Sequence, residues 1–203
     1  MRKFIISIDA GTTSNRSILF DLKGKPVFSS QKEFTQYFPK SGWVEHNPEE
    51  IWRTTIKTLK DVIQKAKKLR GEILNIGITN QRETTVLWDK RTGKPVYNAI
   101  VWQDRRQEEF CAKLRKQNKE TMIFNKTGLL IDSYFSGTKI KWILDNVPKA
   151  KKLMSSNQLL FGTIDSFLIW RFTKGKIHAT DATNASRTMI YNITSNRWDD
   201  TIL

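Results

Sequence analysis

The pattern of apolar and polar positions at the start of the chain predicts three short strands. Apolar and β-branched residues dominate 4–8, 16–21 and 27–34, and small or turn-forming residues separate these runs at 9–14 and 23–25. Connections this short join antiparallel neighbours. We therefore expect the chain to begin with a meander of three antiparallel strands.

The next segment changes to a helical period. Asn47 can cap a helix, Pro48 suits its first position, and the two glutamates that follow complement the positive end of the helix dipole. Apolar residues then recur at helical spacing as far as Ala66, and a buried-strand pattern follows at 73–79. Three strands, a helix and a strand in this order predict an α/β sheet with mixed pairing.

Further along, strand and helix patterns alternate. A hairpin is expected between 84–88 and 96–102, and another strand at 158–161. Helical patterns cover four segments, which are 105–116, 120–126, 137–145 and 164–172. The stretch from Trp198 onward has the pattern of a further helix start. Because no repeat or low-complexity linker interrupts the sequence, we expect one domain over 1–203 that is incomplete on its C-terminal side.

Composition excludes several classes of protein. The chain has 203 residues, of which 38% are hydrophobic, and no run of 18 apolar residues that could cross a membrane. One cysteine and two histidines exclude a disulfide framework and argue against a metal site built from soft ligands. A reducing cytoplasm is the location that these features favour.

The charge balance is the one unusual property of the composition. The sequence has 35 basic and 20 acidic residues, a net charge of +15, which would suit binding to nucleic acid or an anionic surface. The lysines are scattered, however, and form no arginine-rich block interleaved with aromatic residues. We interpret most of them as solvated helix faces, and keep a non-catalytic basic binding module as the alternative hypothesis.

A first group of chemically suggestive residues lies between the first two predicted strands. Asp9 ends one strand, Gly11 and three hydroxyl residues follow, and Arg16 opens the next strand. Amides and hydroxyls in a tight turn can donate to phosphate oxygens, and a carboxylate beside them can hold the water shell of a magnesium ion. On spacing alone, an ordinary hairpin in which Asp9 caps the turn remains equally open.

A second group follows two later predicted strands. Arg82 and Glu83 lie at the end of the strand at 73–79, Trp102 follows a strand that ends at 101, and Tyr134 precedes a predicted helix. Polar groups at strand ends line the crevices in which α/β sheets bind ligands. An arginine, a glutamate and an indole face suit a small polyol. A surface ion pair beside a core tryptophan and a core tyrosine is the alternative.

Six short strings occur in order along nearly the whole chain. They are 9–14, 42–46, 77–83, 98–103, 134–139 and 183–188. Together they resemble the FGGY family of carbohydrate kinases, and within it the members that phosphorylate glycerol. The string at 77–83 argues against the third alternative, a member that acts on a larger sugar. Ala10 departs from the glutamine common in the glycerol-directed members, but the backbone there still supplies the phosphate donors.

The resemblance implies a fold, a reaction and a nucleotide site. The fold is an actin-like ATPase domain of the ribonuclease H-like α/β class, and the reaction transfers the γ-phosphoryl group of MgATP to glycerol, giving sn-glycerol 3-phosphate and ADP. By the same resemblance, ATP or ADP is expected to contact Thr12, Thr13, Ser14 and Arg16. Asp9 is expected to hold magnesium through water.

The resemblance also implies an acceptor site. Arg82, Glu83 and Tyr134 are expected to hydrogen-bond glycerol hydroxyls, while Trp102 packs on the glycerol carbons. Family members have a second domain, and their catalytic aspartate lies in a Gly-Asp-Gln segment that these 203 residues do not contain. We therefore expect no catalytic base in the chain and no activity from the chain alone. A companion chain that carries the second domain and an orphan fragment are the two alternatives that the sequence leaves open.

Overall fold

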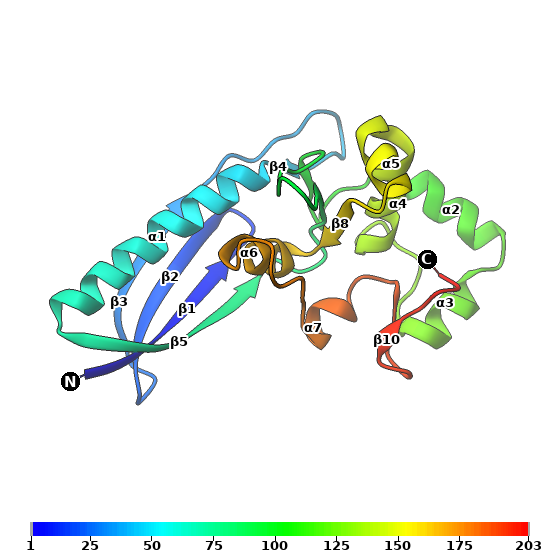
Figure 1. The fold of residues 1–203 in the computed structure, drawn as a ribbon. Coiled ribbons are helices and arrows are strands. Elements are labelled where there is room, and N and C mark those ends of the chain that lie inside the picture. The colour runs from blue at the N-terminus through cyan, green and yellow to red at the C-terminus, as the bar shows by residue number, and fades with distance from the viewer. Residues whose placement is uncertain (1, 203) are drawn as a thin grey trace. The chain divides into compact units, whose positions relative to one another are not determined.

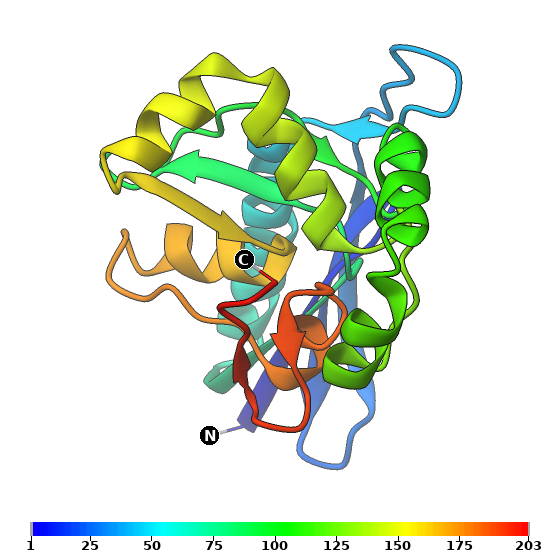
Figure 2. The same ribbon diagram turned by 90° about the vertical axis from the view of Figure 1, so that its right-hand side faces the viewer.

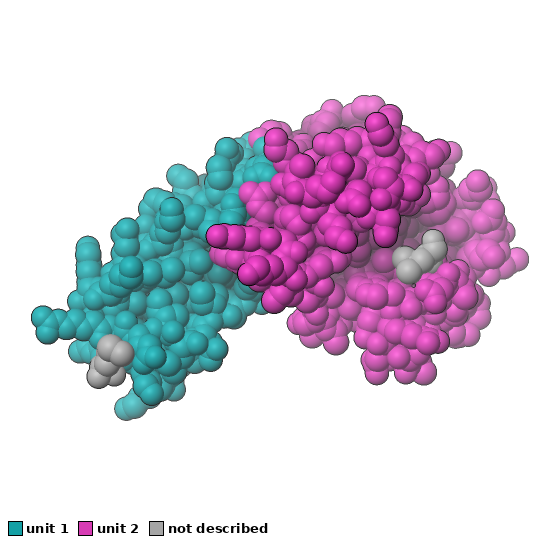
Figure 3. Space-filling view, in the orientation of Figure 1, with its two compact units in different colours: residues 1–36, 47–81 teal, residues 37–46, 82–203 magenta. Residues whose placement is uncertain are grey.

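The computed structural model describes residues 2–202, which cluster into two compact units (Figure 3). The first unit combines 1–36 with 47–81, and the second combines 37–46 with 82–203. No helix among residues 2–202 is both long enough and apolar enough to span a membrane.

The first unit contains a four-stranded sheet. Its strands are β1 (Arg2–Ala10), β2 (Ser14–Asp21), β3 (Pro26–Glu33) and β5 (Gly71–Asn80), in the order β3-β2-β1-β5. The first three strands pair antiparallel, and β5 pairs parallel to β1. The predicted meander and the mixed sheet are both confirmed.

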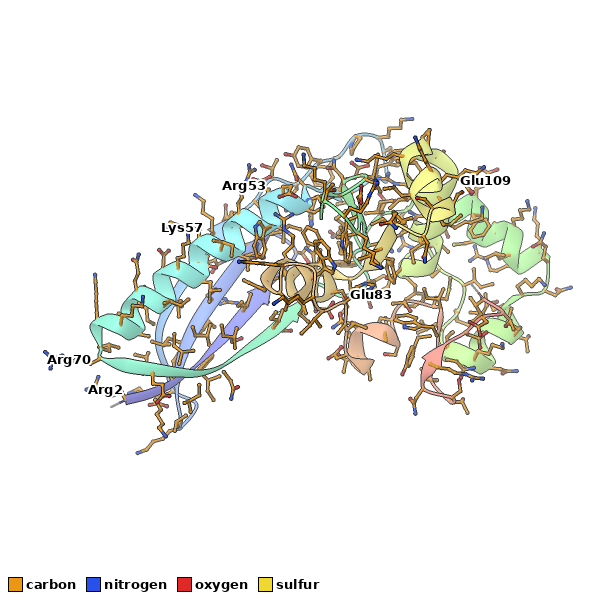
Figure 4. All side chains as sticks on the ribbon, in the orientation of Figure 1. Arg2, Arg53, Lys57, Arg70, Glu83 and Glu109 are labelled. Carbon is orange, nitrogen blue, oxygen red and sulfur yellow. The ribbon has the colours of Figure 1, made fainter. Side chains whose placement is uncertain are left out.

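Helix α1 (Pro48–Lys68) covers one face of this sheet (Figure 1). Asn47 caps it as predicted, because its side chain accepts a hydrogen bond from the amide of Glu49 at 2.9 Å. The buried face of α1 is joined to β2 by polar contacts as well as apolar ones, and Asn15 Nδ2 donates to Thr54 Oγ1 at 2.6 Å. Arg53 and Lys57 are exposed and point away from the sheet (Figure 4).

The second unit is built on two short antiparallel pairs of strands. Strand β4 (Glu45–His46) pairs with β7 (Ala99–Ile100), and β6 (Val86–Asp89) pairs with β8 (Leu159–Gly162). The segments of the predicted hairpin do contact each other, since the amide of Val96 donates to Leu87 O at 2.9 Å. Their main ladders nevertheless run to β8 and β4, partners that are distant in the sequence.

Six helices are described in the second unit. They are α2 (Glu108–Lys116), α3 (Glu120–Thr127), α4 (Ser136–Asn146), α5 (Pro148–Ser155), α6 (Ile164–Phe172) and α7 (Ala182–Ala185). Helix α5 was not predicted; it packs against α4, β6 and β8 (Figure 2). Helix α2 begins three residues later than expected, because Asp104 accepts from the amide and the guanidinium of Arg106 and holds this segment in a turn.

The predicted helix start at Trp198 is wrong. Strands β9 (Tyr191–Asn192) and β10 (Arg197–Trp198) form a hairpin instead. Asp199, just beyond it, accepts two hydrogen bonds from Lys126 Nζ at 2.9 and 3.0 Å, and the amide of Thr201 also donates to its carboxylate. These hydrogen bonds, with Lys126 first, lower the pKa of Asp199. The carboxylate therefore organises a turn.

Candidate functional site

The turn between β1 and β2 places an acid and a base side by side in the first unit. Asp9 and Arg16 lie opposite each other in the antiparallel register, and Arg16 Nη2 is 3.2 Å from Asp9 Oδ2. Their side chains are 35% and 46% exposed, so both can still reach a ligand. Within residues 2–202, the carboxylate accepts from this arginine and not from a turn amide. The interpretation of Asp9 as a cap of the turn is therefore wrong.

Several hydrogen bonds fix the backbone of this turn. The amide of Gly11 donates to Ser14 O at 3.0 Å, and a side chain at position 11 would crowd that carbonyl at 3.1 Å. Gln81, at the end of β5, donates from its amide to Ala10 O at 2.8 Å and from Nε2 to Gly11 O at 3.0 Å. The turn is thus held from the neighbouring strand.

The hydroxyl groups of Thr13 and Ser14 remain available as donors. Thr13 is exposed and Thr12 is partly exposed. Ser14 Oγ accepts a hydrogen bond from Gln31 Nε2 at 2.8 Å and therefore keeps its own proton to donate. A fixed turn with hydroxyls, amides and an arginine suits the oxygens of a phosphate chain.

The donor set near Asp9 fits magnesium only when a phosphate shares it. Among residues 2–202 no group of three or more His, Cys, Asp or Glu side chains is placed to hold a metal ion. Magnesium commonly keeps several waters and takes one or two carboxylates together with substrate phosphates. A single accessible carboxylate beside a turn whose donors suit phosphate oxygens meets that requirement.

The candidate acceptor residues meet in the second unit. The ring centroids of Trp102 and Tyr134 are 5.5 Å apart at an interplanar angle of 56°. The amide of Trp102 donates to Thr84 Oγ1 at 3.3 Å, and the amide of Tyr134 donates to Asp132 Oδ1 at 2.7 Å. Two aromatic rings from different loops thus form one wall beside the segment that carries Arg82 and Glu83.

Glu83 is buried in a left-handed backbone conformation. Its φ is +63° and its exposure is 2%, a combination that costs free energy in a residue other than glycine. Hydroxyls of Thr85 and Ser136 each donate to its carbonyl oxygen at 3.1 Å. Arg187 Nε donates to its Oε1 at 2.6 Å, and no residue within 2–202 donates to Oε2. Glu83 therefore keeps one carboxylate oxygen for a ligand.

Arg82 lies beside Glu83 with a different environment. Its side chain is exposed and makes no hydrogen bond or ion pair within residues 2–202. Of the predicted acceptor residues, Trp102 and Tyr134 contact each other through their rings, and Glu83 is linked to Tyr134 through Arg187. The guanidinium of Arg82 is exposed and has no partner among residues 2–202.

Sequence reasoning did not find two basic residues that support this cluster. Arg187, in the string at 183–188 to which the sequence analysis gave no role in a site, binds Glu83, and its guanidinium carbon lies 5.7 Å from the ring centroid of Tyr134. Lys139 is fully buried and donates to the carbonyl oxygens of Ser133 at 2.8 Å, Phe135 at 3.1 Å, and Tyr134. Burial lowers the pKa of Lys139 to about 7.

The buried side chain of Arg106 gives two residues of the string at 42–46 a structural role. The guanidinium of Arg106 lies 3.8 Å from the ring centroid of Trp43 and 4.6 Å from that of Trp142. It also forms ion pairs of 2.8 Å with Glu45 and with Asp104. All of these charged side chains are at most 3% exposed, so the string contributes a buried ion network that fixes the fold of the second unit.

Comparison with known proteins agrees with this geometry. Residues 4–203 match the N-terminal domain of the FGGY family of carbohydrate kinases. Over 203 residues the chain is 57% identical to a glycerol kinase from Alkaliphilus metalliredigens, and over 202 residues it is 59% identical to one from Malacoplasma penetrans. These alignments cover all of this chain but only 41% and 40% of those proteins.

Solved structures show the same relationship. The crystal structure of Plasmodium falciparum glycerol kinase with ADP matches 99% of this chain with a TM-score of 0.94 and 38% identity, and 40% of that chain is covered. A gluconate kinase from Lactobacillus acidophilus matches with a TM-score of 0.86 and 26% identity, over all of this chain and 39% of its own. The predicted α/β fold of the actin-like ATPase class is confirmed. The chain belongs to the FGGY family of carbohydrate kinases.

Proposed function

We propose that this chain provides the acceptor site and one phosphate-binding turn of a glycerol kinase, which transfers the γ-phosphoryl group of MgATP to glycerol and gives sn-glycerol 3-phosphate and ADP. The observation that carries the proposal is the cluster of Glu83, Trp102 and Tyr134, in which the largely buried side chain of Glu83 keeps one carboxylate oxygen without a donor among residues 2–202. The identity of 57% to 59% with glycerol kinases over the whole chain supports it.

On the acceptor side, each residue has a role that its chemistry permits. Glu83 Oε2 accepts a hydrogen bond from a glycerol hydroxyl, the exposed guanidinium of Arg82 donates to hydroxyl oxygens, and Tyr134 OH can do either. The ring of Trp102 covers the carbon side of the molecule. Together these contacts orient a small, uncharged polyol, and orientation of the acceptor is a large part of catalysis in phosphoryl transfer.

On the nucleotide side, the β1–β2 turn binds phosphate. Thr12, Thr13, Ser14 and Arg16 donate to phosphate oxygens of ATP or ADP, and Asp9 holds magnesium through its water shell. When bound, magnesium would neutralise negative charge on the phosphoryl group. The ion pair of Asp9 with Arg16 keeps both side chains at the turn before the ligand binds.

Three further parts of the proposal concern the wider context. The chain spans about 40% of the length of the relatives that it matches, and we propose that both units belong to one kinase domain that acts together with a second domain. That second domain, or a companion chain that carries it, brings the catalytic base. We also propose a reducing cytoplasm as the location, because Cys111 is a buried free thiol.

Direct binding to the chain tests the acceptor site. With tryptophan side chains labelled with ¹⁵N, glycerol should shift the indole resonance of Trp102, which the variant Trp102→Phe identifies. Gluconate and xylulose, added separately, should not shift it. A resonance that responds to neither glycerol nor these sugars, or that responds to the sugars alone, contradicts the proposed substrate.

Turnover requires a complete enzyme. In a chimera, this chain would replace the matching 41% of the Alkaliphilus metalliredigens glycerol kinase. We expect ADP release that depends on glycerol, and no comparable release with gluconate or xylulose. The variant Asp9→Asn should raise the magnesium concentration needed for half-maximal activity, while an unchanged magnesium dependence would exclude Asp9 from the metal site.

A further inference from the structure

We propose that Arg187 is a positioning residue of the acceptor site: it holds Glu83 so that one carboxylate oxygen faces the polyol. This inference rests on the proposed function and deepens it, because it assigns a role in polyol binding to a residue outside the four acceptor residues already named. It starts from the contact between Arg187 and Glu83, whose positions are 104 residues apart in the sequence.

The contact involves only one atom of each side chain. Arg187 Nε donates to Glu83 Oε1 at 2.6 Å, and neither Nη group of the arginine hydrogen-bonds to any residue within 2–202. A pair that served stability alone would gain most from two parallel hydrogen bonds between guanidinium and carboxylate. Here Oε2 is left without a donor, although the side chain of Glu83 is only 3% exposed. The open Oε2 of this largely buried side chain is therefore set to accept from a ligand hydroxyl.

Aromatic rings fix the plane of the guanidinium. Its carbon lies 4.9 Å from the ring centroid of Phe135 and 5.7 Å from that of Tyr134. These distances are typical of a cation lying over a ring face. Arg187 therefore contacts two of the proposed acceptor residues at once, Glu83 through Nε and Tyr134 through its ring.

The backbone around Arg187 is anchored on both sides. Its amide donates to Asn184 O at 3.0 Å, and Asn184 is itself held by the carboxylate of Asp181 through hydrogen bonds of 2.8 and 2.9 Å. On the other side, the amide of Gly137, at the start of α4, donates to Thr188 O at 2.7 Å. Arg187 thus has a defined position before any ligand arrives.

This arrangement gives the arginine a function in specificity. Fixing Oε1 fixes the rotamer of Glu83, and Oε2 then presents its lone pairs in one direction. A hydroxyl that meets this direction keeps its hydrogen bond through the reaction, so the acceptor is oriented for transfer. Arg187 acts through Glu83 and Tyr134, and the ligand it helps to select is a small polyol with adjacent hydroxyl groups.

Binding of glycerol to the chain provides the first test. The glycerol dissociation constant would be measured from the Trp102 indole shift in wild type and in R187M, which removes the charge and the hydrogen bond to Glu83. We expect binding to weaken roughly 10- to 100-fold, the usual effect of losing a hydrogen bond to a charged group. R187K keeps the charge without the planar contact with the rings, and its glycerol dissociation constant should lie between those of wild type and R187M.

Arg91 offers a matched control. It pairs with a carboxylate, Asp89, that is only 7% exposed, and it lies in the same unit outside the proposed site. R91M should therefore lose a comparable ion pair and bind glycerol as tightly as wild type does. Equal weakening in R91M and R187M, with equal falls in the thermal midpoint, would overturn the inference, because loss of stability would then explain both.

Kinetics in the chimera separate positioning from general damage. R187M should raise the KM for glycerol and lower kcat, while the KM for ATP stays within about twofold of wild type, since only the acceptor is misplaced. A matching rise in the KM for ATP would overturn the inference. If R187M does not fold, R187K decides: a glycerol affinity and a kcat equal to those of wild type would overturn it.

Different results would exclude the proposed function and the role of Arg187. If wild-type protein binds no glycerol, the proposed function is wrong, and the role of Arg187 falls with it. If wild type binds glycerol and R187M binds it equally well, the proposed function stands and only the role of Arg187 is wrong.

Discussion

The ammonium group of Lys139 donates to the main-chain carbonyl of Ser133 at 2.8 Å, from a position with no exposure to solvent. The carbonyls of Tyr134 and Phe135 accept from the same nitrogen. One buried charge thus ties three consecutive peptide groups, and the middle one carries a proposed acceptor residue. The ammonium group therefore holds the loop before α4 against this helix.

Replacing Lys139 by methionine should therefore destabilise the protein and loosen this loop. The substitution keeps the length of the side chain but removes the ammonium donor from all three carbonyls, of which only that of Phe135 keeps another side-chain donor, the hydroxyl of Thr138 at 3.3 Å. We expect the free energy of unfolding to fall by about 1 to 3 kcal/mol, measured by urea denaturation. Lys141→Met is the control, because Lys141 forms an exposed pair with Asp145 and its loss should cost about 0.5 kcal/mol or less. Equal losses of unfolding free energy in both variants would contradict this role of Lys139.

The stability of the protein should fall in mild acid because of His46. Burial lowers the pKa of His46 to about 4, against 6.5 for the free side chain. Between these values the unfolded chain binds a proton that the folded protein does not, so stability declines as the pH falls from 6.5 to 4. With about 1.4 kcal/mol for each pKa unit, this histidine accounts for a decline of about 3 kcal/mol.

Urea denaturation at pH 7 and pH 4.5 measures this decline. His46→Gln should remove most of the difference that the histidine causes, whereas His178→Gln, at the second histidine of the chain, should leave it in place. A pH dependence that is unchanged in His46→Gln would show that other groups control the acid response.

The thiol of Cys111 should be unreactive in the folded protein. It is fully buried, and burial raises its pKa to about 11, so the thiolate is scarce at pH 8. An aromatic disulfide reagent at pH 8 should label less than one tenth of the chain in an hour without denaturant. In 6 M guanidinium chloride it should label one thiol per chain. Fast labelling of the native protein would show that the cluster around Cys111 opens.

Arg82→Ala should impair the acceptor site without harming the fold. Its guanidinium is exposed and pairs with no residue within 2–202, so little stability depends on it. In the chimera we expect the KM for glycerol to rise and kcat to fall, with kcat/KM lowered roughly 10- to 100-fold. Arg53→Ala, at an exposed position of α1, should leave both the KM for glycerol and kcat unchanged. Unchanged kinetics in Arg82→Ala would remove this residue from the site.

The elements of the first unit could be predicted because each has its own local signal. Turn residues separate β1, β2 and β3, and Asn47 with Pro48 defines the start of α1. The pair of Asp9 with Arg16 also follows from local order, since a tight antiparallel connection brings their positions opposite each other. Contacts between residues that are close in the sequence can therefore be predicted from local sequence patterns.

The contacts that build the candidate acceptor site in the second unit could not be predicted from local sequence patterns. Arg187 and Glu83 are 104 positions apart, and only the tertiary fold joins them. Lys139 lies in a helix where a lysine predicts a solvated position, yet its charge is buried against carbonyls of the preceding loop. Helix α5 is hard to predict because a proline commonly marks the end of a helix, whereas Pro148 occupies the first position of a new one.

A polypeptide of residues 1–203, purified alone, should show no measurable glycerol kinase activity. The resemblance to the family places the catalytic base in a segment outside these residues, and loss of such a base typically costs about 10²- to 10⁴-fold in rate. Without a second domain, the exclusion of water by closure is lost as well. A coupled assay of ADP release with and without glycerol measures the rate, and the chimera serves as the active control. Glycerol-dependent turnover at about 1 per second or faster from residues 1–203 would mean that the base lies within this chain.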